Sequence, residues 1–381
     1  MTTGDFILFG QGNYNTLGVL HELSEINISP LILSVGGPKD FHEGNIIGYS
    51  RFAKRVVVVE SDEEGLEWIL AHQGEFPADT IIYPTSDTIE RLLDNNYERL
   101  RGKFRFPNAG AQGAVSRLMD KHWQTDLANK YGIRTLKGQY SNSTDFSFDA
   151  VVYPCMVKPL NSTKGSKGDM KVCENEKELR IALYNGRHTK DFIVQQYIEN
   201  ESDLLFLGVA FGNGEIWLPA VVIKPGVSPT GEYTHAIVST DTDKYLPEKE
   251  NVVRFVRATG YTGPFSIEFG LERGKNYFFE INLRNDGTSH YPLGAGVNIA
   301  AAYISNKPVD SIMPQTYEMI DEVGDIRRVL YKELTLTKWF SSFRKAGTYR
   351  FYKKGDRDLI YPLTRMFMAR LTDKFKRVLK Q

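Results

Sequence analysis

The stretch Phe278-Phe279-Glu280-Ile281-Asn282-Leu283-Arg284 decides the fold of this 381-residue chain. An acid, an amide and a guanidinium occupy every second position, and alternate side chains of a β-strand share one face. Glu280, Asn282 and Arg284 are therefore predicted to point together. They offer two oxygen ligands for a hard cation and one donor fork that suits phosphate. A strand with ordinary surface charges is the alternative for this stretch alone.

A second strand is predicted just upstream, at Phe265-Ser266-Ile267-Glu268-Phe269, with Glu268 facing away from its apolar neighbours. The residues between the strands, 272–276, have the composition of a turn, so the two strands are predicted to form a hairpin. The hairpin would hold Glu268 beside Glu280. Because adjacent carboxylates repel each other unless a cation lies between them, magnesium bound together with nucleotide phosphates is the predicted occupant.

Length and composition limit the classes of protein to consider. A chain of 381 residues is expected to form two or three domains. Basic and acidic residues number 47 each, so net charge gives no reason to expect nucleic acid as a partner. Cys155 and Cys173 do not have the spacing of a zinc site and suit a reduced setting. We see neither a signal peptide nor a run of roughly 20 apolar residues, and expect a cytoplasmic protein.

The first hundred residues alternate apolar strands with helices, which predicts a parallel sheet covered on both faces. Strands are expected at 6–9, 31–35, 56–59 and 80–84, and helices at 63–72 and 87–101. The first strand runs into a glycine turn that resembles a dinucleotide-binding motif. However, its third glycine is displaced to Gly18 and no acid follows the second strand, so an NAD-dependent oxidoreductase is only a minor alternative.

The middle of the chain offers lysines and small residues that suit phosphate. Lys121 lies in a helix expected at 114–131, and Lys158 ends a strand expected at 151–159. The loop that follows, 161–169, is rich in glycine, serine and lysine, and small residues allow the backbone to approach phosphate oxygens closely. A solvated surface lysine and a mobile polar hairpin tip are the structural alternatives.

Another strand, at 192–198, ends in the run Glu199-Asn200-Glu201-Ser202-Asp203. Acids that follow a strand suit contacts to an adenine edge and to ribose hydroxyls, although an acidic turn at a sheet edge is as common. Further antiparallel strands are predicted at 204–210, 216–223 and 236–239, followed by a helix at 252–259.

In this order and spacing, the segments resemble the ATP-grasp superfamily of carboxylate–amine ligases. The resemblance covers about residues 121–298, and the preceding α/β unit matches the domain that usually precedes this fold. The chain looks most similar to the branch with D-aspartate ligase and stand-alone relatives of the carbamoyl phosphate synthetase large subunit. The resemblance implies an architecture that combines α/β and α+β parts. A Rossmann-like pre-ATP-grasp domain at 1–113 precedes an ATP-grasp domain at 114–325, whose two α+β lobes, 114–195 and 196–325, clasp ATP. A basic helical extension follows at 326–381.

The resemblance also implies a role for individual residues. Those implied to contact the phosphates of ATP are Lys121, Lys158, Gly165, Ser166, Lys167, Gly168 and Arg284. Those implied to hold adenine and ribose are Gln195, Gln196, Tyr197, Ile198 and Glu201. Those implied to hold two Mg²⁺ ions, with Mn²⁺ as a substitute, are Glu268, Glu280 and Asn282. Gln196 stands where many members have glutamate, which leaves the role of its side chain open.

The predicted activity is the ATP- and Mg²⁺-dependent joining of a small-molecule carboxylate to an amine, with an amino acid or peptide on at least one side. Phosphoryl transfer would convert the carboxylate into an acyl phosphate, which the amine then attacks. This chemistry needs positioning and charge neutralisation, and Arg284 and Lys167 are the catalytic candidates. His290, in a segment expected to face the substrates, is a third candidate for proton transfer, with a structural role as the alternative. A non-catalytic ATP-binding or regulatory protein is the second hypothesis.

The end of the chain, 363–381, is predicted to form a basic amphipathic helix. Leu363, Phe367, Leu371 and Phe375 recur at intervals of four, with lysines and arginines around them. Packing of this stripe on its own domain or across a homodimer is favoured. A peripheral contact with an anionic membrane, at the inner face of the cell membrane, is the alternative.

Overall fold

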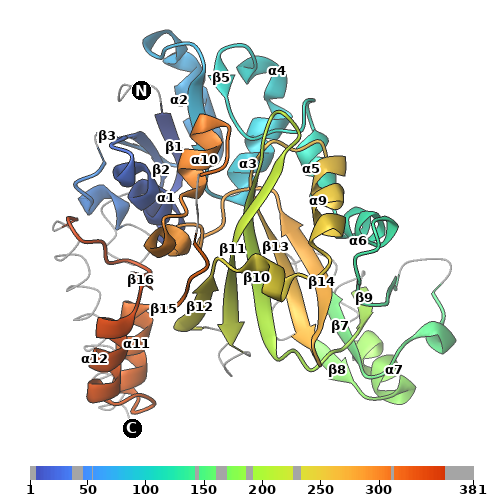
Figure 1. The fold of residues 1–381 in the computed structure, drawn as a ribbon. Coiled ribbons are helices and arrows are strands. Elements are labelled where there is room, and N and C mark those ends of the chain that lie inside the picture. Colours follow the sequence, from blue (N-terminus) through green and yellow to red (C-terminus); the bar gives the residue numbers. More distant parts are fainter. Residues whose placement is uncertain are drawn as a thin grey trace.

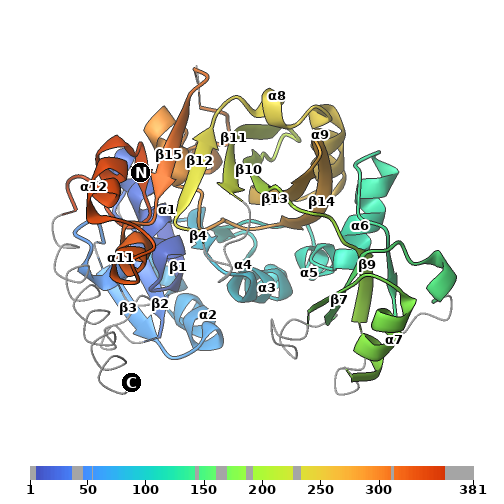
Figure 2. The same cartoon turned by 90° about the horizontal axis from the view of Figure 1, so that it is seen from below.

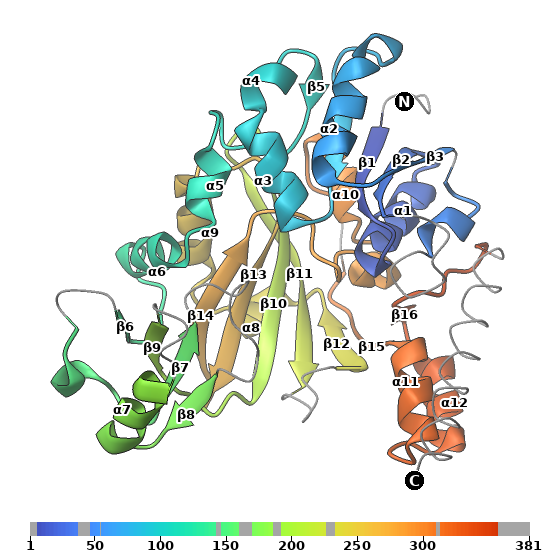
Figure 3. The same cartoon turned by 180° about the vertical axis from the view of Figure 1, so that it is seen from behind.

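The computed structural model describes residues 6–36, 46–53, 55–141, 146–159, 170–185, 192–225, 233–309 and 313–356. The described strands form three sheets, of five, seven and four strands. The seven-stranded sheet lies in the middle of the molecule, and the other two sheets lie on opposite sides of it (Figures 1 and 3). This arrangement confirms the predicted combination of an α/β unit with α+β lobes. The domain boundaries given above stay predictions.

The first sheet is parallel throughout, as the continuous apolar strands predicted. In spatial order its strands are β3 (Arg55–Val59), β2 (Leu31–Val35), β1 (Phe6–Gln11), β4 (Thr80–Pro84) and β5 (Phe104–Arg105). The strand order reverses between β1 and β4, and ligands of open α/β sheets bind at the carboxyl ends of the strands at such a point. Those ends are the glycine turn after β1 and residues 85–87 after β4.

Helices cover this sheet, and polar caps set where three of them begin. They are α1 (Tyr14–Glu25), α2 (Asp62–Ala71), α3 (Asp87–Asn95) and α4 (Tyr97–Leu100), with short 3-10 turns at Ile47–Tyr49 and Gln73–Glu75. Asn13, Ser61 and Ser86 accept hydrogen bonds from the first turns of α1, α2 and α3. Such caps satisfy amide groups that have no partner inside the helix.

The central sheet is antiparallel except where its last two strands pair. In spatial order its strands are β14 (Lys275–Asn282), β13 (Gly263–Glu272), β10 (Ser202–Ala210), β11 (Ile216–Pro225), β12 (His235–Ser239), β15 (Thr316–Ile320) and β16 (Thr348–Tyr349). Arg273 and Gly274 join β13 to β14 with φ values of 49° and 72°. Two consecutive left-handed residues are typical of a two-residue hairpin turn, so the predicted hairpin is confirmed.

The third sheet is small and has a core of its own. Its strands, in spatial order, are β6 (Gly138–Tyr140), β9 (Phe192–Gln196), β7 (Cys155–Pro159) and β8 (Lys171–Cys173). Helix α7 (Glu176–Asn185) and a 3-10 turn at Phe148–Ala150 accompany it. Cys155 and Cys173 lie opposite each other as free, buried thiols in this core.

The remaining helices lie between β5 and β6 or between strands of the central sheet. They are α5 (Ala114–Leu118), α6 (Lys121–Lys130), α8 (Thr242–Tyr245), α9 (Lys249–Ala258), α10 (Ile299–Ser305), α11 (Glu322–Leu330) and α12 (Leu336–Lys345), with a 3-10 turn at Tyr291–Ala295. The single helix predicted at 114–131 was wrong, because Asp120 adopts an extended conformation and caps a new helix by accepting the Trp123 N–H. The basic helix predicted at 363–381 lies outside the described residues. No described helix is long and apolar enough to cross a membrane.

The two faces of the central sheet are buried against different partners. Leu205 and Leu207 of β10 belong to one core with Phe6 and Tyr83 of the first sheet. The intervening side chains of β10 point to the opposite face, which packs against α9 in a second core. Figure 2 shows α8 and α9 above the sheet and both other sheets below it. The face of the central sheet opposite α9, called the lower face below, is therefore the one that contacts the other two sheets.

Gly65 of α2 tests how closely this helix packs on the first sheet. A Cβ atom at Gly65 would lie 2.5 Å from Cζ of Phe9. Alanine for glycine within a helix normally adds about 1 kcal/mol, but overpacking a core costs about 1–3 kcal/mol. We expect Gly65→Ala to lower the free energy of unfolding, measured by urea denaturation. Gly74→Ala, where a Cβ meets nothing within 4 Å, is the control and should not destabilise the protein. An unchanged or raised stability of Gly65→Ala would contradict the packing.

Candidate functional site

Two carboxylates lie opposite each other on the lower face of the central sheet. Glu268 of β13 pairs directly with Glu280 of β14, and their side chains are 21% and 26% exposed. A β-bulge follows, in which Phe269 pairs with Phe278 and Phe279 is left without an opposite residue. Because of the bulge, Phe278 lies in the core that contains α9, while Glu280 points to the lower face of the sheet. The prediction that Glu268 and Glu280 lie side by side is confirmed.

Asn282 adds an amide beside the two carboxylates. It lies opposite Ser266, and its side-chain nitrogen donates to the Ser266 hydroxyl over 3.4 Å. This bond leaves the amide oxygen as a potential cation ligand. Among the described residues, no three His, Cys, Asp or Glu side chains form a metal cluster. The two paired carboxylates and the amide oxygen are hard oxygen ligands, which fit a cation that takes one or two protein carboxylates and completes its shell with ligand oxygens, as Mg²⁺ does.

Each carboxylate has a lysine partner in this structure. Lys121 Nζ lies 2.6 Å from Glu280 Oε2, and Lys224 Nζ lies 3.4 Å from Glu268 Oε1. Burial raises the pKa of Glu268; Lys224 opposes this, and Asp203 and Glu280 add to it. For Lys224, burial works against the charged form, but Glu268 and nearby acids raise its pKa overall. The site thus contains mutually repelling acids that cations hold together.

Lys158 approaches the same region from the small sheet. Its Nζ donates to Gln195 Oε1 over 3.1 Å. Burial and the charge of Lys121 lower its pKa, against the attraction of Glu280. The structure therefore brings Lys121, Lys158 and Glu280 within electrostatic reach, although the lysines come from separate elements. Two lysines that repel each other favour an anion between them.

Arg284 is held by an acid of the first unit. Its Nε and Nη2 donate to the two carboxylate oxygens of Asp87 over 2.7 and 3.2 Å, and its Nη1 donates to the Asn285 carbonyl over 3.1 Å. Burial works against its charge, but Asp286 and Asp87 raise its pKa. A carboxylate thus occupies the donor fork predicted for phosphate, and the two groups present oxygens in similar geometry.

The glycine turn of the first unit is fastened to the loop that follows β14. Asn285 donates to Asn15 Oδ1 over 2.7 Å, and its own Oδ1 accepts the Tyr83 hydroxyl over 3.0 Å. Asn15 in turn donates to the Thr85 carbonyl over 2.7 Å. The carboxyl ends of β1 and β4 therefore meet the residues just after the Glu280 strand.

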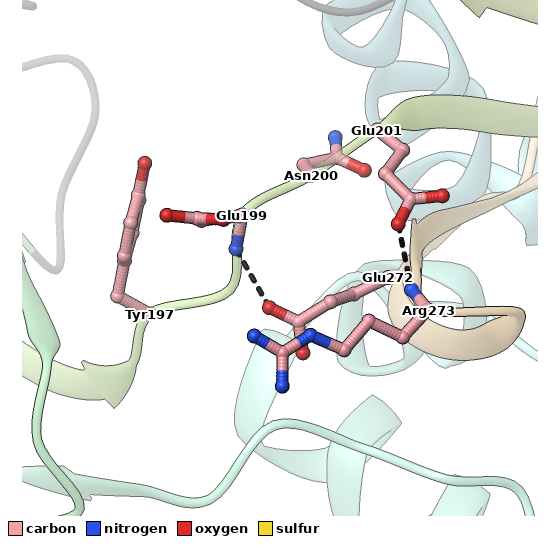
Figure 4. A pocket seen from close by; sticks show the side chains of 6 residues that line it. All are labelled: Tyr197, Glu199, Asn200, Glu201, Glu272 and Arg273. Atoms are coloured by element: carbon pink, nitrogen blue, oxygen red, sulfur yellow. Dashed lines mark hydrogen bonds between the residues drawn. The ribbon is translucent and has the colours of Figure 1, made fainter.

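A pocket of about 320 Å³ lies where β9 leads into β10 (Figure 4). Its lining residues are Tyr197, Glu199, Asn200, Glu201, Glu272 and Arg273. The Glu201 carboxylate accepts the backbone N–H of Arg273 over 2.9 Å, and Glu272 accepts that of Glu199 over 2.8 Å. These bonds join the segment between the sheets to the tip of the β13–β14 hairpin.

The segment predicted to hold adenine and ribose is only partly directed toward the carboxylates. Gln195 points toward Lys158, whereas the backbone N–H groups of Gln196 and Tyr197 donate to the carbonyls of Lys137 and Pro154. Ile198 is buried. Glu201, exposed and committed to the hairpin turn, does not join the charged cluster.

Asp203 is the acid that joins the cluster instead. It lies opposite Lys224 across β10 and β11, and its charge raises the pKa of both Lys224 and Glu268. Sequence analysis named Asp203 only within an acidic run, and it placed neither Lys224 nor Asp87 beside the carboxylates or Arg284. The alternation that places Asp203 on the lower face was visible in the sequence, but the pairing that brings Lys224 beside it was not.

His290 lies in the segment that was expected to face the substrates, and it contacts helix α1 and strand β16. The ring is buried, its Nε2 lies 3.3 Å from the Tyr349 carbonyl, and a Cβ at Gly18 would be 2.3 Å from its Nδ1. Burial lowers its pKa to about 4. The structure therefore favours the structural alternative for His290. The loop residues Gly165, Ser166, Lys167 and Gly168 lie outside the described residues.

Comparison with known proteins gives relatives of partial length. No protein-family model matches the chain. The formate-dependent phosphoribosylglycinamide formyltransferase of Bacteroides fragilis is 29% identical over 235 residues, which span 58% of each chain. An L-amino acid ligase from Bacillus licheniformis superposes with a TM-score of 0.61 at 16% identity, over 84% of this chain and 80% of that one. The ADP complex of an N5-carboxyaminoimidazole ribonucleotide synthetase gives 0.64 at 15% identity, over 88% and 87%. The chain thus shares its fold with these structures over 84% and 88% of its length, and it spans little more than half the length of its formyltransferase relative.

The buried ring of His290 predicts a pH dependence of stability. Unfolded histidine binds a proton near its ordinary pKa of 6.5, whereas folded His290 does so only at about 4. The unfolded state therefore binds more protons in this window, and stability falls as pH drops from about 6.5 toward 4. Between about pH 7 and pH 5 the expected loss from this group is about 2 kcal/mol. Urea denaturation of the wild type and of His290→Asn at both pH values should show a smaller loss in the variant; equal losses would contradict the assignment.

Proposed function

We propose that the chain is an ATP-grasp ligase that uses ATP and Mg²⁺ to join a carboxylate to an amine. The carrying observation is the direct pairing of Glu268 with Glu280, with Asn282 beside them and lysines on both sides. Such a cluster suits a site in which metal ions and phosphates neutralise each other. The structural neighbour in its ADP complex supports a nucleotide as ligand.

In this proposal Glu268, Glu280 and Asn282 hold the Mg²⁺ ions. We propose two ions by analogy with the ATP-grasp superfamily. Bound Mg²⁺ would neutralise the charge of the phosphates during transfer. Lys121 and Lys158 contact the phosphates, which requires Lys121 to exchange Glu280 for a phosphate oxygen. The charge of Lys224 opposes the burial that raises the pKa of Glu268, so this lysine favours the ionised carboxylate that a metal ion needs.

We propose that Arg284 exchanges the Asp87 carboxylate for the transferred phosphate. The donor fork is already formed and oriented by the bidentate contact. Preorganised donors need little rearrangement when charge develops on the reacting group. The carboxylate substrate would receive the γ-phosphoryl group, and the amine would then attack the acyl phosphate and release phosphate.

The substrates are proposed to be small molecules, with an amino acid or peptide-like group on at least one side. The structural similarity to an L-amino acid ligase supports an amino acid as substrate. The formyltransferase relative is formate-dependent, and formate is a small carboxylate, which supports a carboxylate substrate. We place the substrates where the glycine turn and Thr85 meet the loop after β14, since these segments adjoin Arg284. A homodimer, a membrane contact of the C-terminal helix and closure of the loop with Lys167 stay predictions.

The direct test is release of ADP from ATP and Mg²⁺, screened over pooled D- and L-amino acids and dipeptides. We expect release that depends on one pool. Glu280→Gln should abolish it, because the amide cannot supply the negative charge that the metal requires, while the variant keeps its far-ultraviolet circular dichroism.

Two results would contradict the proposal. Release by the wild type and by Glu280→Gln at equal rates would remove the carboxylate pair from the chemistry. If ATP raises the midpoint of thermal unfolding but no pool causes release of ADP, the result would favour a non-catalytic ATP-binding protein for the substrate classes tested.

We also propose that Asp203, rather than Glu201, is the acid that contacts the nucleotide. Asp203 belongs to the charged cluster, whereas Glu201 caps the hairpin turn. We therefore expect Asp203→Asn to weaken ADP binding, measured by isothermal titration calorimetry, more than Glu201→Gln does. Loss of one hydrogen bond to a charged group corresponds to about 1.5–3 kcal/mol. A larger effect of Glu201→Gln would restore the sequence-based assignment of this residue to ribose.

A further inference from the structure

Gln124 of α6 makes an unusual contact with the backbone of β14. Its side-chain oxygen accepts the Ile281 N–H over 3.1 Å, and its side-chain nitrogen donates to the Ile281 carbonyl over 3.0 Å. The same nitrogen donates to the Leu118 carbonyl over 2.9 Å. The residue is 3% exposed. One buried amide therefore satisfies both outward-facing backbone groups of Ile281.

The two groups that Gln124 binds belong to the peptides that carry Glu280 and Asn282. The Ile281 N–H lies in the peptide shared with Glu280, and the Ile281 carbonyl lies in the peptide shared with Asn282. In the described sheet β14 is an edge strand, so the backbone of Ile281 has no strand partner on its outer side. The Gln124 side chain, chemically an amide like the peptide group, takes the place of that strand.

Gln124 also fixes the helix that carries Lys121. The two residues are three positions apart, so they lie on neighbouring parts of the helix surface. Lys121 Nζ lies 2.6 Å from Glu280. Beyond the helix, the Arg134 carbonyl accepts the Phe278 N–H over 2.8 Å, so the chain follows β14 at a second point.

We propose that Gln124 is a positioning residue: it sets the register of α6 against β14, so that Glu280, Asn282 and Lys121 meet in one site. The inference rests on the proposed function, because the ligand role of Glu280 and Asn282 is part of it. Gln124 touches neither substrate nor metal in this scheme and acts through the backbone of the strand.

The main variant is Gln124→Met, which keeps the length of the side chain and removes both hydrogen-bonding groups. Asn276→Leu is the matched control. Asn276 is a buried amide on the same strand, and it donates to the Tyr245 carbonyl over 2.7 Å without contacting the peptides next to Glu280 or Asn282. Both variants should lower the midpoint of thermal unfolding.

The deciding measurement is Mn²⁺ affinity in the presence of saturating ADP, followed by electron paramagnetic resonance of free Mn²⁺. We expect Gln124→Met to bind Mn²⁺ about 10-fold more weakly or worse, as found when outer partners of metal ligands are removed. Asn276→Leu should keep the wild-type affinity for Mn²⁺ and for ADP.

Gln124→Glu provides a second probe if Gln124→Met does not fold. A protonated glutamic acid can donate to the Ile281 carbonyl and accept its N–H, whereas a carboxylate can only accept. The ratio of variant to wild-type Mn²⁺ affinity should therefore be near one at low pH and fall as pH rises. A ratio independent of pH would overturn the proposal.

The outcomes separate this inference from the proposed function. Wild-type Mn²⁺ binding that Gln124→Met retains in full would overturn the positioning role alone. Equal loss of Mn²⁺ affinity in Gln124→Met and Asn276→Leu would show a general effect of destabilisation and would also overturn it. Absence of Mn²⁺ binding by the wild type with ADP would overturn the proposed function and this inference with it.

Discussion

The repulsion between Glu268 and Glu280 is the constraint on which the rest of the site depends. The hairpin register forces the two carboxylates together, and partial burial prevents water from separating their charges fully. Lysines must therefore approach from elsewhere: Lys121 from α6 and Lys224 from β11. Helix α6, strand β11 and the small sheet each bring a lysine to the lower face, and these positive charges reduce the repulsion between the two carboxylates.

The β-bulge at Phe279 reconciles a core strand with a polar site. A regular strand would place Phe278 and Glu280 on the same face, so one of them would be in the wrong environment. With one extra residue, Phe278 remains in the core that contains α9 and Glu280 reaches the lower face. Phe279, left unpaired, lies against Gly270, where a side chain would collide with its ring. The same β-bulge therefore allows both the packing of Phe278 in the core and the position of Glu280 in the site.

Local patterns predicted much of this fold, and contacts between distant segments accounted for what they missed. The alternation of Glu280 and Asn282 and the turn within 272–276 are properties of adjacent residues, and both predictions hold. Arg284 lies beyond the end of β14. The interruption at Asp120 is also local, but two short helices follow each other there with only Met119 and Asp120 between them, and the prediction merged them. By contrast, Asp203, Asp87 and the burial of His290 depend on which elements pack together. One sequence contains no direct record of such pairs, so these positions required coordinates.

The shared core of the first and central sheets has a consequence for motion. Phe6, Tyr83, Leu205 and Leu207 are packed in one apolar cluster, so the two sheets resist separation as the interior of a single domain does. The four-stranded sheet has its own small core, and the chain joins it to its neighbours at two places, before β6 and after β9. A change in the relative position of the sheets would therefore disturb less apolar packing at the four-stranded sheet than at the first sheet.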